Sequence, residues 1–279
     1  MNERKPSTFG KRSAGTYLRR SIVVAYLFFL VAWPVALVGI KTFDGGLDNL
    51  QAAFSDPSVT FALQLTVYVA VWAVAINTVF GVGISLLLVR YDFPGRGVLS
   101  ALIDLPLSVS PVVVGLALLL AYGGTNGTFG PALESAGLQI AFAPAGIIMA
   151  TAFVSLPLVI RELVPVLQEI GTDQELAARS LGAGPWQTFR RITLPSIRWA
   201  LVYGVVLSLA RSLGEFGAVK IVSGNIAEQT QTATLVVEEK YQDFEQGSAY
   251  ATSFLLALIA VAALVLVTIL RPKENSDGN

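Results

Sequence analysis

Arg211 and Glu215 stand four residues apart inside a long apolar stretch that covers residues 197–222. Side chains four apart lie on one face of a helix, so the two charges can neutralise each other. A charged group inside a membrane is costly and by default indicates a functional site. The spacing therefore predicts either a structural ion pair or an anion contact at Arg211, and the sequence favours neither over the other.

Serine hydroxyls accompany this pair in the apolar parts of the chain, at Ser108, Ser110, Ser208 and Ser212. Pro111 follows the first two and removes a backbone donor, which leaves polar backbone free beside them. These hydroxyls are candidates to donate hydrogen bonds along an anion pathway. The alternative is structural, because serines in membrane helices more often bond their own backbone or a neighbouring helix.

Cysteine and histidine are both missing from the 279 residues. Disulfides, thiol chemistry, a histidine base and the usual zinc ligands are therefore excluded. The sequence also lacks the GxxxxGK[ST] pattern that cradles nucleotide phosphates, so any ATP hydrolysis belongs to another chain. We expect no catalytic residue, no metal site and no cofactor bound by this chain.

The elements that carry these residues are predicted to be membrane helices. Hydrophobic residues make up 54% of the chain and charged residues only 14%, far from the composition of a soluble domain. The apolar segments are long enough to span a bilayer. We predict an all-α integral membrane protein with one transmembrane domain at 21–271 and tails at 1–20 and 272–279, whose six spans lie at about 21–40, 59–89, 98–122, 143–160, 197–222 and 249–270.

Lysine and arginine set the orientation of these spans. Six of the nineteen lie in residues 1–20, two in 90–97, five in 161–198 and two in 271–273, whereas Lys41, Lys220 and Lys240 fall on the other side. The positive-inside rule then puts both termini and the 162–196 loop in the cytoplasm. Because the first apolar run is longer than that of a signal peptide and no cleavage site follows it, we expect an uncleaved anchor.

The 162–196 loop contains a compact helical elbow. Thr172 and Glu175 have the spacing of a capping box, which predicts a helix beginning there. Gly182 stands where a left-handed residue would end that helix, and Pro185 is suited to the first position of a second short helix. On this second helix the apolar side chains fall three apart on one face, at Trp186, Phe189 and Ile192.

The elbow resembles the EAA loop of bacterial ABC importer membrane subunits, written EAA-x3-G-x9-I-x-LP. The matching residues are Ala177, Ala178, Gly182, Ile192, Leu194 and Pro195. The motif's glutamate position holds Leu176, and the acid, Glu175, stands one residue earlier. The resemblance implies a coupling helix that docks on a cytoplasmic ATPase, with Glu175 either contacting that ATPase or only capping the helix.

Two further stretches resemble the sulfate/thiosulfate permeases within that family, and in particular the W-type member of their permease pair. They are Ser-Val-Ser-Pro-Val-Val at 108–113 and the run from Arg211 to Val219, which continues through 222–226 and 229–232. Molybdate permeases share the Gly-Glu-Phe-Gly-Ala core, so that core alone does not decide between them. The likeness extends from the second span to the sixth.

This resemblance implies a type I ABC importer permease fold in the bacterial inner membrane. It also implies a T-type second permease in a heterodimer, two ATP-binding subunits that use ATP and Mg, and a periplasmic sulfate-binding protein. Lipid surrounds the spans, and no nucleic acid is expected. The stretch 223–247, with a short helix at 232–244, is predicted to face the periplasm, either as a docking surface for the binding protein or as a covering loop.

The sequence also allows three other functions. A molybdate or other oxyanion permease fits the same motifs. An ion-coupled secondary transporter would use Glu215 and Asp104 as proton or sodium sites. A membrane-embedded serine hydrolase would need a Ser-Lys dyad built from Lys41 or Lys220 at a membrane edge.

Overall fold

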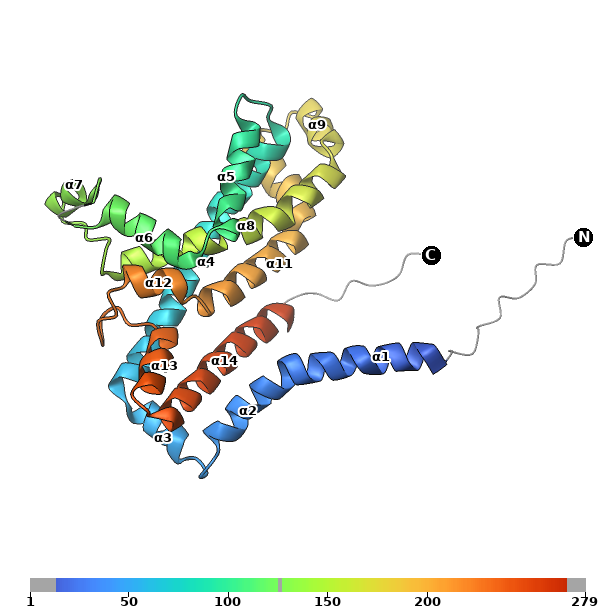
Figure 1. Ribbon diagram of the computed structural model, residues 1–279. Coiled ribbons are helices and arrows are strands. Elements are labelled where there is room, and N and C mark those ends of the chain that lie inside the picture. The colour runs from blue at the N-terminus through green and yellow to red at the C-terminus, as the bar shows by residue number, and fades with distance from the viewer. Residues whose placement is uncertain (1–13, 125–126, 270–279) are drawn as a thin grey trace, which may run out of the picture.

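A computed structural model describes residues 14–124 and 127–269, and the regular elements in these ranges are helices (Figure 1). Five helices are long and apolar enough to cross a membrane, and a sixth span results if one bent pair is counted. The all-α membrane fold is confirmed. Of the tails predicted at 1–20 and 272–279, residues 1–13 and all of 272–279 lie outside the described residues.

The first span stands apart from the others. It covers Arg19–Thr42 and consists of α1 (Ala14–Leu27), the π-helical turn η1 (Phe28–Ala32) and α2 (Trp33–Thr42). The π turn ends two residues before Pro34, whose missing N–H removes one backbone hydrogen bond of the regular helix. The most apolar part of this span has no buried residue. Its second half, α2, packs on α14 (Gln246–Ile269).

Three long helices form the centre of the bundle: α4 (Pro57–Arg90), α8 (Pro144–Ile170) and α11 (Leu194–Leu213). Glycine allows their close approach. A Cβ at Gly81 would lie 2.7 Å from Val159 Cγ1, and a Cβ at Gly204 would lie 3.0 Å from Val159 Cα. Small residues at helix crossings are the usual means of tight packing in membranes.

The third predicted span is not a single helix. It divides into α5 (Arg96–Ser108) and α6 (Pro111–Tyr122), which are bent by 116°. Pro111 takes the first position of α6, and a proline disfavours the helical conformation in the residue before it. Ser110 accordingly has ψ of 134°. The sequence predicted an interruption of the 98–122 span at Pro111, and the break lies there, while Pro106 stays inside α5.

The fifth predicted span is also divided. Helix α11 ends at Leu213, and the short α12 (Gly217–Val222) begins after an irregular stretch at 214–216. The prediction of a continuous helix over 197–222 is wrong for its last turns. The fourth span differs in length, because α8 extends to Ile170 and takes in the start of the loop predicted at 162–196.

Short helices lie at the two ends of the bundle. In Figure 1, α9 (Asp173–Ser180) and the start of α5 lie at the top, whereas α3 (Asp48–Ser55) and α13 (Ala233–Gln242) lie at the bottom. Helix α7 (Gly130–Ser135) follows α6. Helix α13 confirms the helix predicted at 232–244. Its start is buried, and the Ala233 N–H donates to Thr66 Oγ1 of α4 at 2.9 Å, so this part of 223–247 covers the bundle.

An ion-pair cluster fastens α13 to its neighbours. Lys240 Nζ lies 3.0 Å from Asp56 Oδ2, ahead of α4, and 2.8 Å from Glu245 Oε2, ahead of α14. Partial burial acts to raise the pKa of Asp56, but hydrogen bonds from Lys240 and the Ser58 N–H outweigh it, so this pKa is lowered. The two carboxylates raise the pKa of Lys240.

Candidate functional site

The elbow has the predicted local structure. Helix α8 ends at Ile170 with Gly171 as its C-cap, and α9 follows. Gly182 has φ of +86°, the left-handed conformation that glycine adopts without a steric cost. The Ala183 N–H then donates to the Ala178 carbonyl at 3.0 Å, as in a Schellman ending. Pro185 occupies the first position of α10 (Pro185–Thr188), and a π-helical turn, η2 (Phe189–Thr193), leads into α11.

The capping box, by contrast, is not formed. Thr172 makes no side-chain cap, and Glu175 turns into the protein, where it is 8% exposed. Its Oε1 accepts hydrogen bonds from Arg90 Nε at 3.3 Å, from Arg90 Nη2 at 3.2 Å and from Thr193 Oγ1 at 2.9 Å. The guanidinium group adds a full positive charge and two N–H donors to this contact, which a neutral backbone N–H cannot offer to the carboxylate. Sequence reasoning counted Arg90 only as a topology signal and missed this contact.

The outer face of the elbow is apolar. Leu181 is 89% exposed, Trp186 70% and Leu176 54%, and the Trp186 and Phe189 rings lie 5.5 Å apart between centroids. Exposed apolar groups gathered at one polar end of a protein are typical of an interaction surface. We call this the elbow face. Of the motif residues, Ala177, Gly182 and Pro195 are exposed, whereas Ala178, Ile192 and Leu194 are half-buried.

Within the membrane region, Arg211 and Glu215 form the predicted ion pair. Arg211 Nη1 lies 2.7 Å from Glu215 Oε2, with the arginine side chain 37% exposed and the glutamate only 2%. The two do not share one continuous helix, since Glu215 lies in the break after α11. There its Oε1 accepts from the Ala218 N–H at 3.0 Å, which binds the first turn of α12.

The two helix breaks lie against each other. A Cβ at Gly217 would be 3.0 Å from Pro111 Cβ, and a Cβ at Gly115 would be 2.8 Å from the Ala218 carbonyl oxygen. The serines before α6, Ser108 and Ser110, are exposed. Interrupted helices that meet within the membrane are the usual framework of transport sites, because they free polar backbone where it can face a substrate.

Ser208 and Ser212 point to a different place. Both are buried, in a polar cluster between α4, α8 and α11 that we call the Asn77 cluster. Asn77 Nδ2 donates to Ser155 Oγ at 2.8 Å and to Ser208 Oγ at 3.3 Å, and the Ser155 and Ser212 hydroxyls are 3.3 Å apart. These contacts favour a packing role over a pathway role. Sequence reasoning missed Asn77 and Ser155, although Asn77 is a polar residue in an otherwise apolar span.

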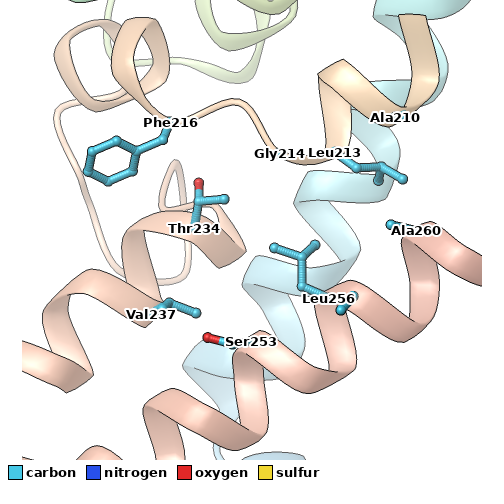
Figure 2. A pocket seen from close by; sticks show the side chains of 10 residues that line it. Ala210, Leu213, Gly214, Phe216, Thr234, Val237, Ser253, Leu256 and Ala260 are labelled. Carbon is cyan, nitrogen blue, oxygen red and sulfur yellow. The ribbon is translucent and has the colours of Figure 1, made fainter. Parts of the chain in front are cut away.

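An apolar cavity of about 450 Å³ adjoins the second break. Figure 2 shows Leu213 and Gly214 at the end of α11, Thr234 and Val237 on α13, and Leu256 on α14 around this space. Its hydroxyls come from Thr234 and Ser253 only, and no charged residue lines it. An unpaired dianion would be poorly solvated there, so this cavity is not the anion site. Within the described residues, no group of three or more acidic side chains could hold a metal ion.

Comparison with known proteins identifies a family of membrane transport components. A family model described as "Binding-protein-dependent transport system inner membrane component" matches residues 77–275. The chain is 46% identical over 257 residues to the sulfate transport system permease protein CysW of Synechococcus elongatus, covering 92% of this chain and 90% of that protein.

It is also 40% identical over 224 residues to the sulfate transport system permease protein CysT of Escherichia coli, covering 80% of this chain and 79% of that protein. Among solved structures, one chain of a bacterial alginate ABC transporter in complex with an alginate pentasaccharide-bound periplasmic protein matches with a TM-score of 0.76. That match is 16% identical and covers 91% of this chain and 92% of the other, so it shows the fold alone.

Proposed function

Because the chain belongs to the family of inner membrane components of binding-protein-dependent transport systems, we propose that it is the permease subunit of an ATP-driven sulfate importer. The observation that carries this proposal is the likeness to sulfate permeases over nine-tenths of the chain. The predicted inner-membrane location follows from the same family and from the five to six candidate spans.

Coupling to ATP hydrolysis is assigned to the elbow. The exposed apolar side chains of the elbow face would enter a groove of the partner ATPase, and the motif residues Ala177, Ala178, Gly182, Ile192, Leu194 and Pro195 would shape the elbow for that fit. Glu175 is buried and paired with Arg90, so we assign it the role of fixing α9 to the end of α4. ATP and Mg would be bound by the ATPase.

Further subunits complete the proposed assembly. The unburied span Arg19–Thr42 exposes many apolar side chains to its surroundings, which fits contact with lipid and with a second permease. Similarity to a T-type permease supports a heterodimer of related chains. By analogy with the alginate transporter, a periplasmic binding protein would deliver the anion. The resemblance of the elbow to the EAA loop of ABC importers implies that two ATP-binding subunits would drive the pair.

The anion pathway is assigned to the facing helix breaks. Sulfate is a dianion, and its hydration must be replaced by hydroxyls, freed backbone or a positive charge. Arg211 keeps over a third of its side chain exposed, and Ser108 and Ser110 are exposed at the adjacent break. Glu215 neutralises part of the arginine charge, which makes anion binding weak enough for release. Ser208 and Ser212 are buried among hydrogen-bond partners of the Asn77 cluster, which supports leaving them out of the proposed pathway.

Radiolabelled sulfate uptake tests the proposal in cells that lack the chain and regain it, with thiosulfate, molybdate and selenate as competitors. We expect uptake to require both the chain and the ATPase. Uptake that persists without the ATPase would instead favour an ion-coupled carrier. Preferential competition by molybdate would reassign the substrate.

Variants at Arg211 test the pathway within that assay. Arg211→Ala should lower uptake more than Arg211→Lys, because a lysine keeps the positive charge. Arg96→Gln is the matched control, since Arg96 forms an exposed pair with Asp92 at the end of α5 that is opposite to the break. Equal losses for both Arg211 variants, with normal membrane levels, would contradict a role for its charge.

A further inference from the structure

Arg90 is the last residue of α4, and its guanidinium group lies at a junction of four helical elements. Its Nη1 donates to the Leu167 carbonyl at 3.0 Å and its Nη2 to the Gly171 carbonyl at 2.8 Å, both at the end of α8. Those carbonyls belong to the last turn, which has no partners of its own within the helix. A positive charge there also meets the negative end of the helix dipole.

The same guanidinium group binds the elbow. Its Nε and Nη2 reach Glu175 Oε1 on α9, and Thr193 Oγ1, just before α11, donates to the same oxygen at 2.9 Å. Both charged side chains are only 11% exposed. One arginine and one carboxylate oxygen therefore connect the ends of α4 and α8, the first elbow helix and the start of α11.

Apolar packing surrounds this junction and makes it stiff. The buried side chains Leu163, Leu167 and Ile197 form one cluster, with Val89 and Ile170 packed against it. Because the pair is largely excluded from water, separating Arg90 from Glu175 would leave two buried charges without partners. Helix α9 cannot tilt away from α4 and α8 without that loss.

We propose that Arg90, Glu175 and Thr193 form a joint through which displacement of the elbow moves α4 and α8 as one body. This inference rests on the proposed function. It adds positioning residues that lie outside the elbow motif: Arg90 is 85 positions before Glu175 and holds the elbow through that carboxylate. The elbow face receives the force, and the joint passes it to the two longest central helices.

A distance measurement tests the joint independently of transport. Because the chain has no cysteine, spin labels can be attached at Val79→Cys on α4 and Ser180→Cys on α9, both exposed, in a complex with cysteine-free partners. The distance between labels is measured by pulsed electron paramagnetic resonance in the nucleotide-free and vanadate-trapped complexes. We expect the same narrow distribution in both states, and a change between them in the parent protein would overturn the joint.

Variants then test the contacts themselves. Glu175→Gln keeps the size of the side chain but loses its charge, so the distribution should broaden in the trapped state. The ATP hydrolysed per sulfate carried should rise at least about tenfold, the ratio that corresponds to about 1.4 kcal/mol of lost coupling. Asp92→Asn is the matched control, because it removes an exposed ion pair at the same end of the bundle.

The results of these measurements support or refute the joint as follows. Broadened distances and poor coupling in an assembled Glu175→Gln complex support the joint, and parent-like values for both measurements refute it. If the Glu175→Gln variant fails to assemble, Thr193→Val is used instead, because it removes one hydrogen bond and leaves the ion pair. We expect an intermediate loss of coupling in Thr193→Val. Coupling equal to that of the parent protein would refute the joint. A parent complex that assembles but carries no sulfate would refute the proposed function. The distances between the spin labels would still test the joint, because they do not depend on sulfate transport.

Discussion

Gly115 lies where α6 crosses α12, and the expected effect of adding one methyl group there can be worked out from the structure. A Cβ at this position would lie 2.8 Å from the Ala218 carbonyl oxygen and 2.8 Å from Ile221 Cβ. Ordinary C···O contacts are about 3.3–3.6 Å, so the two helices would have to move apart. The carbonyl is backbone and cannot swing aside as a flexible side chain would.

Overpacking of this kind costs about 1–3 kcal/mol. Alanine gains about 0.5–1 kcal/mol over glycine inside a helix, which offsets only part of that cost. We therefore expect Gly115→Ala to destabilise the protein by ~1–2 kcal/mol, or roughly 2–8 °C in melting temperature. Sulfate uptake per folded chain should also fall, because the crossing fixes the two helix breaks relative to each other.

Gly97→Ala is the matched control for this change. Gly97 lies in α5, the other half of the same broken span, and a Cβ there would meet nothing within 4 Å. It should melt at or slightly above the parent temperature. The melting temperature of both variants in detergent, followed by uptake in cells, makes the comparison. If Gly115→Ala melts and transports like Gly97→Ala, the close crossing of α6 and α12 is not present in the protein.

Three other changes have defined outcomes. Asn77→Leu should cost about 0.6–1.7 kcal/mol in thermal melting, the range for hydrogen bonds between membrane helices, and leave uptake per folded chain unchanged; a selective loss of uptake would contradict a packing role. Asp56→Asn should lower the melting temperature at neutral pH. The difference should shrink as pH falls below about 4, the ordinary pKa of a carboxyl group, and vanish as pH passes through the lowered pKa of Asp56. At alkaline pH it should persist up to the raised pKa of Lys240, above the ordinary value of about 10.4, and be lost as Lys240 loses its charge; a constant difference across pH would contradict the ion pair. Gly182→Val should weaken copurification of the ATPase, because φ of +86° is strained for a β-branched residue, whereas Gly184→Val, at φ of −69°, should not; equal copurification would count against the elbow.

The spans and the elbow could be predicted because their signals are local. Apolar runs of about 20 residues indicate membrane helices wherever they occur, and Gly182 and Pro185 fix turn geometry within a few residues. The same local rules failed at Glu175. A capping box within four residues was a sound expectation, but a buried arginine far away in the sequence offered the carboxylate a stronger partner.

Broken helices show the limit of a hydropathy pattern. Residues 98–122 and 197–222 are mostly apolar, so the hydropathy pattern predicted one membrane span in each. Pro111 gave a local reason for the first interruption. At the second, Glu215 binds the Ala218 N–H and Arg211 at once, and α6 packs closely on the separate α12.

The membrane class and the helical elbow could thus be read from composition and turn residues, which act over short distances along the chain, and the charge counts predict the orientation. Which polar groups meet depends on how the helices pack. Asn77 and Ser208 are 131 positions apart, and Arg90 and Glu175 are 85 apart. Such contacts arise from the crossing of α4 with α8 and α11, and the pairing is strong because hydrocarbon and packed side chains leave a buried donor no water to bind.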